Sequence, residues 1–137
     1  MNGVLVDSNV ILDIFEDDPV WADWSEYQLE NVADTAPIYI NPIIYTEVSI
    51  GFDTIEDLES AVKGCGFRML QLPRESLFLA GKVFLQYRQR NGIKTAPLPD
   101  FYIGAHAAVY RLKLLTRDKS RYPTYFPTVE LITPSNT

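Results

Sequence analysis

Short runs of apolar residues constrain the fold of this 137-residue chain more than any other feature. They show no alternation of apolar and polar residues, which is typical of strands buried on both faces of a parallel sheet. We expect strands at residues 4–6, 38–40, 68–70, 114–115 and 129–132. Longer segments with helical spacing separate them. Strands that alternate with helices predict an α/β protein whose mainly parallel sheet is covered on both faces.

Capping residues and apolar spacing mark the helices between these strands. The expected helices begin at Ser8 or Asn9, at Pro19, at Pro42 behind Asn41, at Asp53, after Pro73 and at Pro99. Asp53 and Glu56 resemble a capping box. In the helix after Pro73, the spacing predicts one face made of Leu77, Gly81, Phe84, Leu85 and Arg88.

Length and composition predict one domain, residues 1–137, with a core of about residues 3–133. No apolar run approaches the roughly 20 residues that span a bilayer. Asp7 interrupts the apolar start, so we expect neither a signal peptide nor membrane contact. The single cysteine, Cys65, excludes an internal disulfide and a cysteine-rich zinc site, and it fits a reducing cytoplasm.

The net charge of −6 is divided unevenly along the chain. Residues 1–62 hold 14 of the 18 acidic residues and no lysine or arginine, whereas residues 63–137 hold all 12 basic residues. Such asymmetry permits a basic surface on an acidic protein, and so contact with phosphate or an acidic partner. A self-complementary dimer, or no function at all, explains the charge equally well.

Acidic residues follow two of the expected strands. Asp7 comes directly after the first strand and Asp118 just after the fourth. Ligands of open α/β sheets bind beyond the carboxyl ends of the strands, so neighbouring strands would bring both carboxylates to one rim. Asp100 joins them only if the loop 91–99 carries its helix end to that edge. Glu47 has largely apolar neighbours, which favours a side chain facing a cleft. Each acid also has a structural interpretation, as a helix cap, a dipole partner or a turn residue.

Four sequence blocks together resemble the acidic blocks of PIN-domain ribonucleases. The blocks are VDSNVILD, YTEV, LPDFYIGAHA, and LLTRD followed by YPTYFP. In length, block order and spacing, the chain is similar to the VapC-type toxins of toxin–antitoxin pairs from Val4 to Ile132. The resemblance implies a three-layer α/β/α sandwich with a five-stranded, mainly parallel sheet. It also implies a magnesium-dependent endoribonuclease toxin that forms a homodimer and binds a cognate VapB-like antitoxin.

The resemblance assigns roles to individual residues. It matches four acids to catalytic and metal-binding positions, namely Asp7, Glu47, Asp100 and Asp118, with Asp7 and Asp100 as the most direct metal ligands. Asn9 and Thr116 match supporting positions. Asp13 and Asp17 are nearby acids that match no family position.

Carboxylates alone suffice for the implied chemistry. Mg²⁺ and Mn²⁺ prefer carboxylate and water oxygens and keep exchangeable waters. A bound ion can lower the pKa of a water and neutralise charge on the scissile phosphate. Acids packed together would repel one another without a cation. With this chemistry, the resemblance implies in-line hydrolysis of an RNA phosphodiester bond with one or two metal ions.

Basic residues near the acids are candidates for contact with RNA phosphates, namely Lys94, Arg117 and Lys119. The aromatic residues Tyr122, Tyr125 and Phe126 could stack on bases, although packing of this last turn against the sheet is favoured. His106 is the only histidine. Its position six residues after Asp100, in an alanine-rich helix, favours packing over a role as catalytic base.

Two other functions remain open. A catalytically inactive PIN-like module would bind RNA or a partner without cleavage, but all four acids are present. A different acid-pocket α/β protein is the second. A haloacid-dehalogenase-like phosphatase needs a second aspartate where this chain has Asn9. A phosphotransfer receiver needs an acceptor aspartate after a middle strand, where this chain has Gln71.

Overall fold

The computed structural model describes residues 2–91 and 98–134 and contains one sheet of five parallel strands. The strands are β1 (Val4–Val6), β2 (Ile38–Ile40), β3 (Arg68–Met69), β4 (Lys113–Leu115) and β5 (Leu131–Ile132). Their order is β3-β2-β1-β4-β5, which confirms the parallel sheet expected from the sequence. The order reverses at β1, so the switch point lies between β1 and β4.

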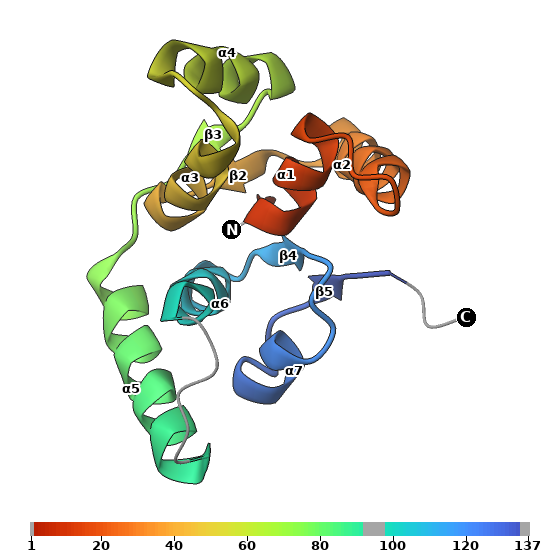
Figure 1. The fold of residues 1–137 in the computed structure, drawn as a ribbon. Helices are drawn as coiled ribbons and strands as arrows, with labels where there is room; N and C mark the ends of the chain where they lie inside the picture. The colour runs from red at the N-terminus through yellow and green to blue at the C-terminus, as the bar shows by residue number, and fades with distance from the viewer. Residues whose placement is uncertain (1, 92–97, 135–137) are drawn as a thin grey trace.

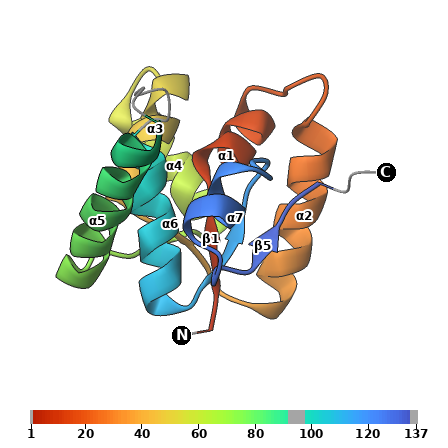
Figure 2. The ribbon, with the colours of Figure 1, turned by 90° about the horizontal axis from the view of Figure 1, so that it is seen from below.

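Helices cover both faces of this sheet. They are α1 (Ser8–Phe15), α2 (Ala22–Thr35), α3 (Pro42–Val48) with the 3₁₀ turn η1 (Ser49–Gly51), α4 (Ile55–Cys65), α5 (Arg74–Asn91), α6 (Leu98–Tyr110) and α7 (Arg121–Tyr125). Helices α1 and α2 lie on one side of the row of strands, and α5, α6 and α7 lie on the other (Figure 1). Figure 2 shows α5 and α6 side by side. The architecture is the expected α/β/α sandwich.

The core is built on the two central strands. Leu5 and Val6 of β1 and Leu114 and Leu115 of β4 have no exposed surface. Consecutive strand residues point to opposite faces, so full burial requires cover on both sides of the sheet. Within the described residues, no helix has the length and hydropathy needed to cross a bilayer.

Two helix caps differ from the expected ones by a residue. Ser8 and Asn9 do not cap α1; Asp7 does, which was its structural interpretation, because its carboxylate accepts the Ser8 N–H at 2.8 Å. Thr54 caps α4 in place of Asp53, through a bond from a backbone N–H at 3.1 Å. Neighbouring residues of the capping type compete for such positions, and the approach of the chain decides between them.

Helix α2 begins at Ala22, three residues later than the expected start at Pro19. The carboxylate of Asp18 accepts the backbone N–H groups of Val20 and Trp21 at 2.9 and 2.8 Å. These bonds stabilise a turn at residues 19–21, and α2 begins only after this turn.

The buried face of α5 differs from the expected one. The residues of α5 with 7% exposure or less are Ser76, Ala80, Val83 and Tyr87. Leu77 and Leu85, expected on the inner face, are 42% and 46% exposed. Tyr87 packs against Phe101 of α6, with 5.5 Å between the ring centres, so contact with α6 sets the buried face of α5.

Candidate active site

Asp7 and Thr116 stand at the carboxyl ends of the adjacent strands β1 and β4. The Asp7 N–H donates to the Leu115 carbonyl at 2.9 Å, which extends the strand pairing by one residue. Thr116 Oγ1 donates to Asp7 Oδ2 at 2.8 Å and accepts the Asp118 N–H at 3.1 Å. One hydroxyl thus links the two acids at the switch point, where strand order led us to expect them.

The carboxylate of Asp7 is buried, with 3% of the residue exposed. Its donors are the Ser8 N–H (2.8 Å), Thr116 Oγ1 (2.8 Å), the Tyr122 hydroxyl (3.0 Å) and Asn9 Nδ2 (3.4 Å). Burial, together with the nearby charge of Asp100, raises the pKa of Asp7 to about 6 against the opposing effect of the hydrogen-bond donors. This position therefore favours a neighbouring cation.

Asn9 of α1 and Thr116, the residue after β4, both donate hydrogen bonds to Asp7. Asn9 Nδ2 donates to Thr116 Oγ1 at 3.2 Å, and Asn9 Oδ1 accepts the Arg117 N–H at 3.2 Å. The side chain of Asn9 on α1 is thereby fixed to the segment that follows β4.

Glu47 of α3 reaches the group through Ser8. Ser8 Oγ donates to Glu47 Oε1 at 2.8 Å and lies 3.5 Å from Asp7 Oδ1. Burial raises the pKa of Glu47, and the charge of Asp100 raises it as well. Glu47 therefore lies close to the other acids, and it is partly solvent-accessible.

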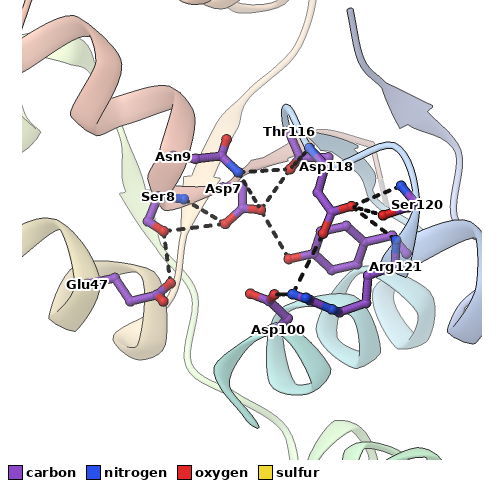
Figure 3. Close-up of polar contacts among 10 residues, drawn as sticks. Asp7, Ser8, Asn9, Glu47, Asp100, Thr116, Asp118, Ser120 and Arg121 are labelled. Atoms are coloured by element: carbon purple, nitrogen blue, oxygen red, sulfur yellow. Dashed lines mark hydrogen bonds and ion pairs between the residues drawn. The ribbon is translucent and has the colours of Figure 1, made fainter. Parts of the chain in front are cut away.

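Arg121, the first residue of α7, connects the last two acids. Its Nη1 donates to Asp100 Oδ2 and lies 3.8 Å from Asp118 Oδ2. Figure 3 shows the guanidinium group between the two carboxylates. Burial raises the pKa of Asp100 even though Arg121 opposes the effect. The four predicted acids are thus joined by hydrogen bonds and ion pairs through Ser8, Thr116 and Arg121.

The position of Asp100 follows from the topology. In a parallel sheet, the helix that leads into a strand starts at the carboxyl edge and returns to the amino edge. Helix α6 leads into β4, and Asp100 lies in the first turn of α6. Asp100 is therefore at the carboxyl edge of the sheet. Our expectation that only the preceding loop could bring it there was too restrictive, because the crossover alone suffices.

Sequence reasoning missed the roles of Tyr122 and Arg121. Tyr122 is 1% exposed and its hydroxyl bonds Asp7, so its ring packs in the core rather than being open to a base. The only signal was proximity to Asp118 in the sequence. Tyr122 contacts Asp7 and Arg121 contacts Asp100, each more than 20 residues away along the chain. These contacts depend on the position of α7, which the sequence did not predict.

The predicted phosphate-binding residues have different surroundings. Arg117 forms a two-pronged ion pair with Asp13, at 2.7 and 3.0 Å, and its guanidinium lies 5.2 Å from the centre of the Trp21 ring. Asp13, which matches no family position, thus has a structural partner. Lys119 is exposed near Asp118. Lys94 lies outside the described residues.

His106 is buried, and its hydrogen-bond partner is Asn41 rather than one of the acids, in line with the packing role expected for it. Ile44 N–H donates to Asn41 Oδ1, which fixes the amide so that Asn41 Nδ2 faces His106 Nδ1 at 3.0 Å. His106 Nδ1 must accept this bond, which leaves the proton on Nε2. That atom has no partner among the described residues. Burial lowers the pKa of His106 to about 4, so the ring is neutral at pH 7.

The donor set suits a hard divalent cation. All four acids offer carboxylate oxygens, which Mg²⁺ and Mn²⁺ prefer. A positive charge already lies among them, because the Arg121 guanidinium contacts both Asp100 and Asp118. Within the described part of the chain, no group of three or more Asp, Glu, His or Cys side chains is arranged closely enough to hold a metal ion. The carboxylate oxygens suit a divalent metal ion chemically. In this structure the Arg121 guanidinium provides the positive charge beside Asp100 and Asp118.

Comparisons with known proteins give one family and one fold. The family model of the PIN domain matches residues 4–124. No curated protein sequence matches the chain.

Several solved structures share the fold over nearly the whole chain. A chain of VapBC2 from Rickettsia felis, crystallised with a DNA fragment from its promoter, has a TM-score of 0.73 at 18% identity, with 96% of this chain and 98% of that chain covered. A toxin–antitoxin complex from Klebsiella pneumoniae has a TM-score of 0.67 at 23% identity, with 98% and 99% covered. FitAcB from Neisseria gonorrhoeae has a TM-score of 0.69 at 21% identity, again with 98% and 99% covered. At these identities the likeness concerns the fold.

Proposed function

The chain belongs to the PIN domain family, and on that premise we propose that it is a metal-dependent endoribonuclease. The observation that carries the proposal is the meeting of four acids from distant parts of the chain at the carboxyl edge of the sheet. They come from the ends of β1 and β4 and from the helices α3 and α6. Helix capping alone does not explain why four carboxylates lie at one edge of the sheet, because their negative charges repel one another.

Asp7 and Asp100 would hold the cation most directly, with Glu47 and Asp118 completing its surroundings. Mg²⁺, or Mn²⁺ in its place, would neutralise charge on the scissile phosphate and lower the pKa of a water. Ser8, Asn9 and Thr116 hold the carboxylates in place through the hydrogen bonds described above. Such outer contacts keep ligand oxygens oriented toward the ion.

Basic side chains near the acids would position the RNA backbone. Lys119 is exposed two residues before Arg121 and is our first candidate for a phosphate contact. Arg117 remains a candidate, although its guanidinium is engaged by Asp13. Lys94 precedes α6 in the sequence and stays a proposal of the sequence alone.

We also propose that the protein acts as the toxin of a toxin–antitoxin pair in the cytoplasm, as a homodimer bound by a VapB-like antitoxin. Support comes from the solved relatives, which include a toxin–antitoxin complex and VapBC and FitAB assemblies. The alternative is a PIN-like module that binds RNA or a partner without cutting it.

RNA cleavage by the purified protein decides between these two. We expect cleavage of a mixed RNA substrate in Mg²⁺ or Mn²⁺ and none after chelation. Asp100→Asn should abolish cleavage, because it removes a proposed ligand at similar side-chain volume. Asp34→Asn makes the same chemical change at an exposed position on α2 and should cut like the parent. Equal cleavage by parent and Asp100→Asn contradicts the assignment, and RNA binding without cleavage by the parent favours the binding module.

A further inference from the structure

Arg121 brings a positive charge into contact with two acids of the cluster, Asp100 and Asp118. Its side chain is 30% exposed, and those of Asp100 and Asp118 are 17% and 20% exposed. The group is thus partly withdrawn from water, where opposite charges attract more strongly than at an open surface. The ion pair with Asp100 also has hydrogen-bond geometry.

The backbone places Arg121 at the cluster. Asp118 Oδ1 accepts the Arg121 N–H at 3.0 Å, together with the Ser120 N–H at 2.9 Å and Ser120 Oγ at 3.2 Å. One oxygen of Asp118 is therefore occupied by the start of α7. The other, Oδ2, is the oxygen that faces the guanidinium (Figure 3).

The guanidinium and a divalent cation would be held by the same two carboxylates. Asp118 has only Oδ2 left to offer, and Asp100 Oδ2 already accepts from Arg121. Two cations held by the same carboxylates repel each other, and this repulsion is strong where the group is partly withdrawn from water. Binding of one cation must therefore weaken binding of the other.

We propose that Arg121 is an internal competitor for the divalent cation. It neutralises Asp100 and Asp118 while no metal is bound and has to leave them when a metal binds. The chain thereby sets its own metal affinity, through a residue three positions after the proposed ligand Asp118. This inference rests on the proposed metal-dependent function.

Titration of the chelator-treated protein with Mn²⁺ alone, followed by calorimetry, tests the competition. Arg121→Gln should bind Mn²⁺ about tenfold more tightly than the parent, which corresponds to about 1.4 kcal/mol. Arg121→Lys keeps the charge but loses the planar fork, so its affinity should fall between the two. Lys113→Gln is the matched control. It removes one positive charge at the other end of β4, from a side chain paired with Glu130, and should bind like the parent.

A second readout uses thermal unfolding. Since a ligand that binds only the folded state stabilises it in proportion to its affinity, Mn²⁺ should raise the Tm of Arg121→Gln more than that of the parent. Circular dichroism checks that each variant is folded. If Arg121→Gln is unfolded, the Mn²⁺ affinity of Arg121→Lys provides the test.

The outcomes separate the two proposals. If the parent binds Mn²⁺ and neither Arg121 variant binds it more tightly, competition by Arg121 is wrong and the metal-dependent function stands. If no protein in the series binds Mn²⁺, the proposed metal dependence fails and the competition falls with it.

Discussion

The buried carboxylate of Asp7 should make the metal-free protein less stable as the pH rises. Its pKa is raised from the ordinary 3.8 to about 6, because burial outweighs the donors around it. A group whose pKa is higher in the folded state contributes stability at low pH and loses it as the pH rises through the folded value. The full effect is about 3 kcal/mol, of which about 1.3 kcal/mol is lost between pH 5 and pH 7.

Asp7→Asn isolates this contribution because the amide does not titrate. The variant loses acceptors for Thr116 and Tyr122, at a cost of about 1 kcal/mol for each bond. This cost is the same at both pH values. Relative to the parent, the free energy of unfolding of Asp7→Asn should therefore rise by about 1.3 kcal/mol from pH 5 to pH 7.

Urea unfolding followed by circular dichroism in metal-free buffer measures this difference. Asp34→Asn provides the control, because its exposed carboxylate should give the same stability difference from the parent at both pH values. If the free energy of unfolding of Asp7→Asn relative to the parent stays constant, or falls, from pH 5 to pH 7, the donors at least balance burial and the reasoning is refuted.

Two further substitutions test the packing and the ion pair beside the site. Gly104→Ala should lower the free energy of unfolding by about 1–3 kcal/mol, because its new Cβ would lie 2.3 Å from the ring of Phe126; an unchanged urea midpoint would contradict this packing. Asp13→Asn should cost about 2 kcal/mol, since Arg117 loses a buried partner but is itself 29% exposed; urea unfolding measures the loss, and a variant as stable as the parent would count against the pair.

The sequence predicted the sheet better than the helices. Runs such as Val4–Val6 and Ile38–Ile40 are apolar because both faces of a parallel sheet are covered, and this requirement is local enough to read in the sequence. The inner face of α5 depends instead on how closely α6 approaches. Ala80 is fully buried there while Phe78 is 68% exposed, an outcome that no residue of α5 determines alone.

The acids were predictable to different degrees. Asp7 and Asp118 follow adjacent strands, so the strand order alone brings them together. Asp100 could have been placed by the crossover before β4, whereas Glu47 came from family resemblance and meets the others through Ser8. The contacts of Arg121 depend on the exact placement of α7, which no pattern in the sequence specified.

The central claim is that the four acids at the carboxyl edge of the sheet form a binding site for divalent metal. Anomalous diffraction from crystals soaked in Mn²⁺ tests it most directly, because the metal is located without reference to activity. The account predicts an anomalous peak in contact with Asp7 and Asp100, with the guanidinium of Arg121 moved away from Asp100. Manganese found only elsewhere on the protein, with Arg121 still paired to Asp100, would contradict it.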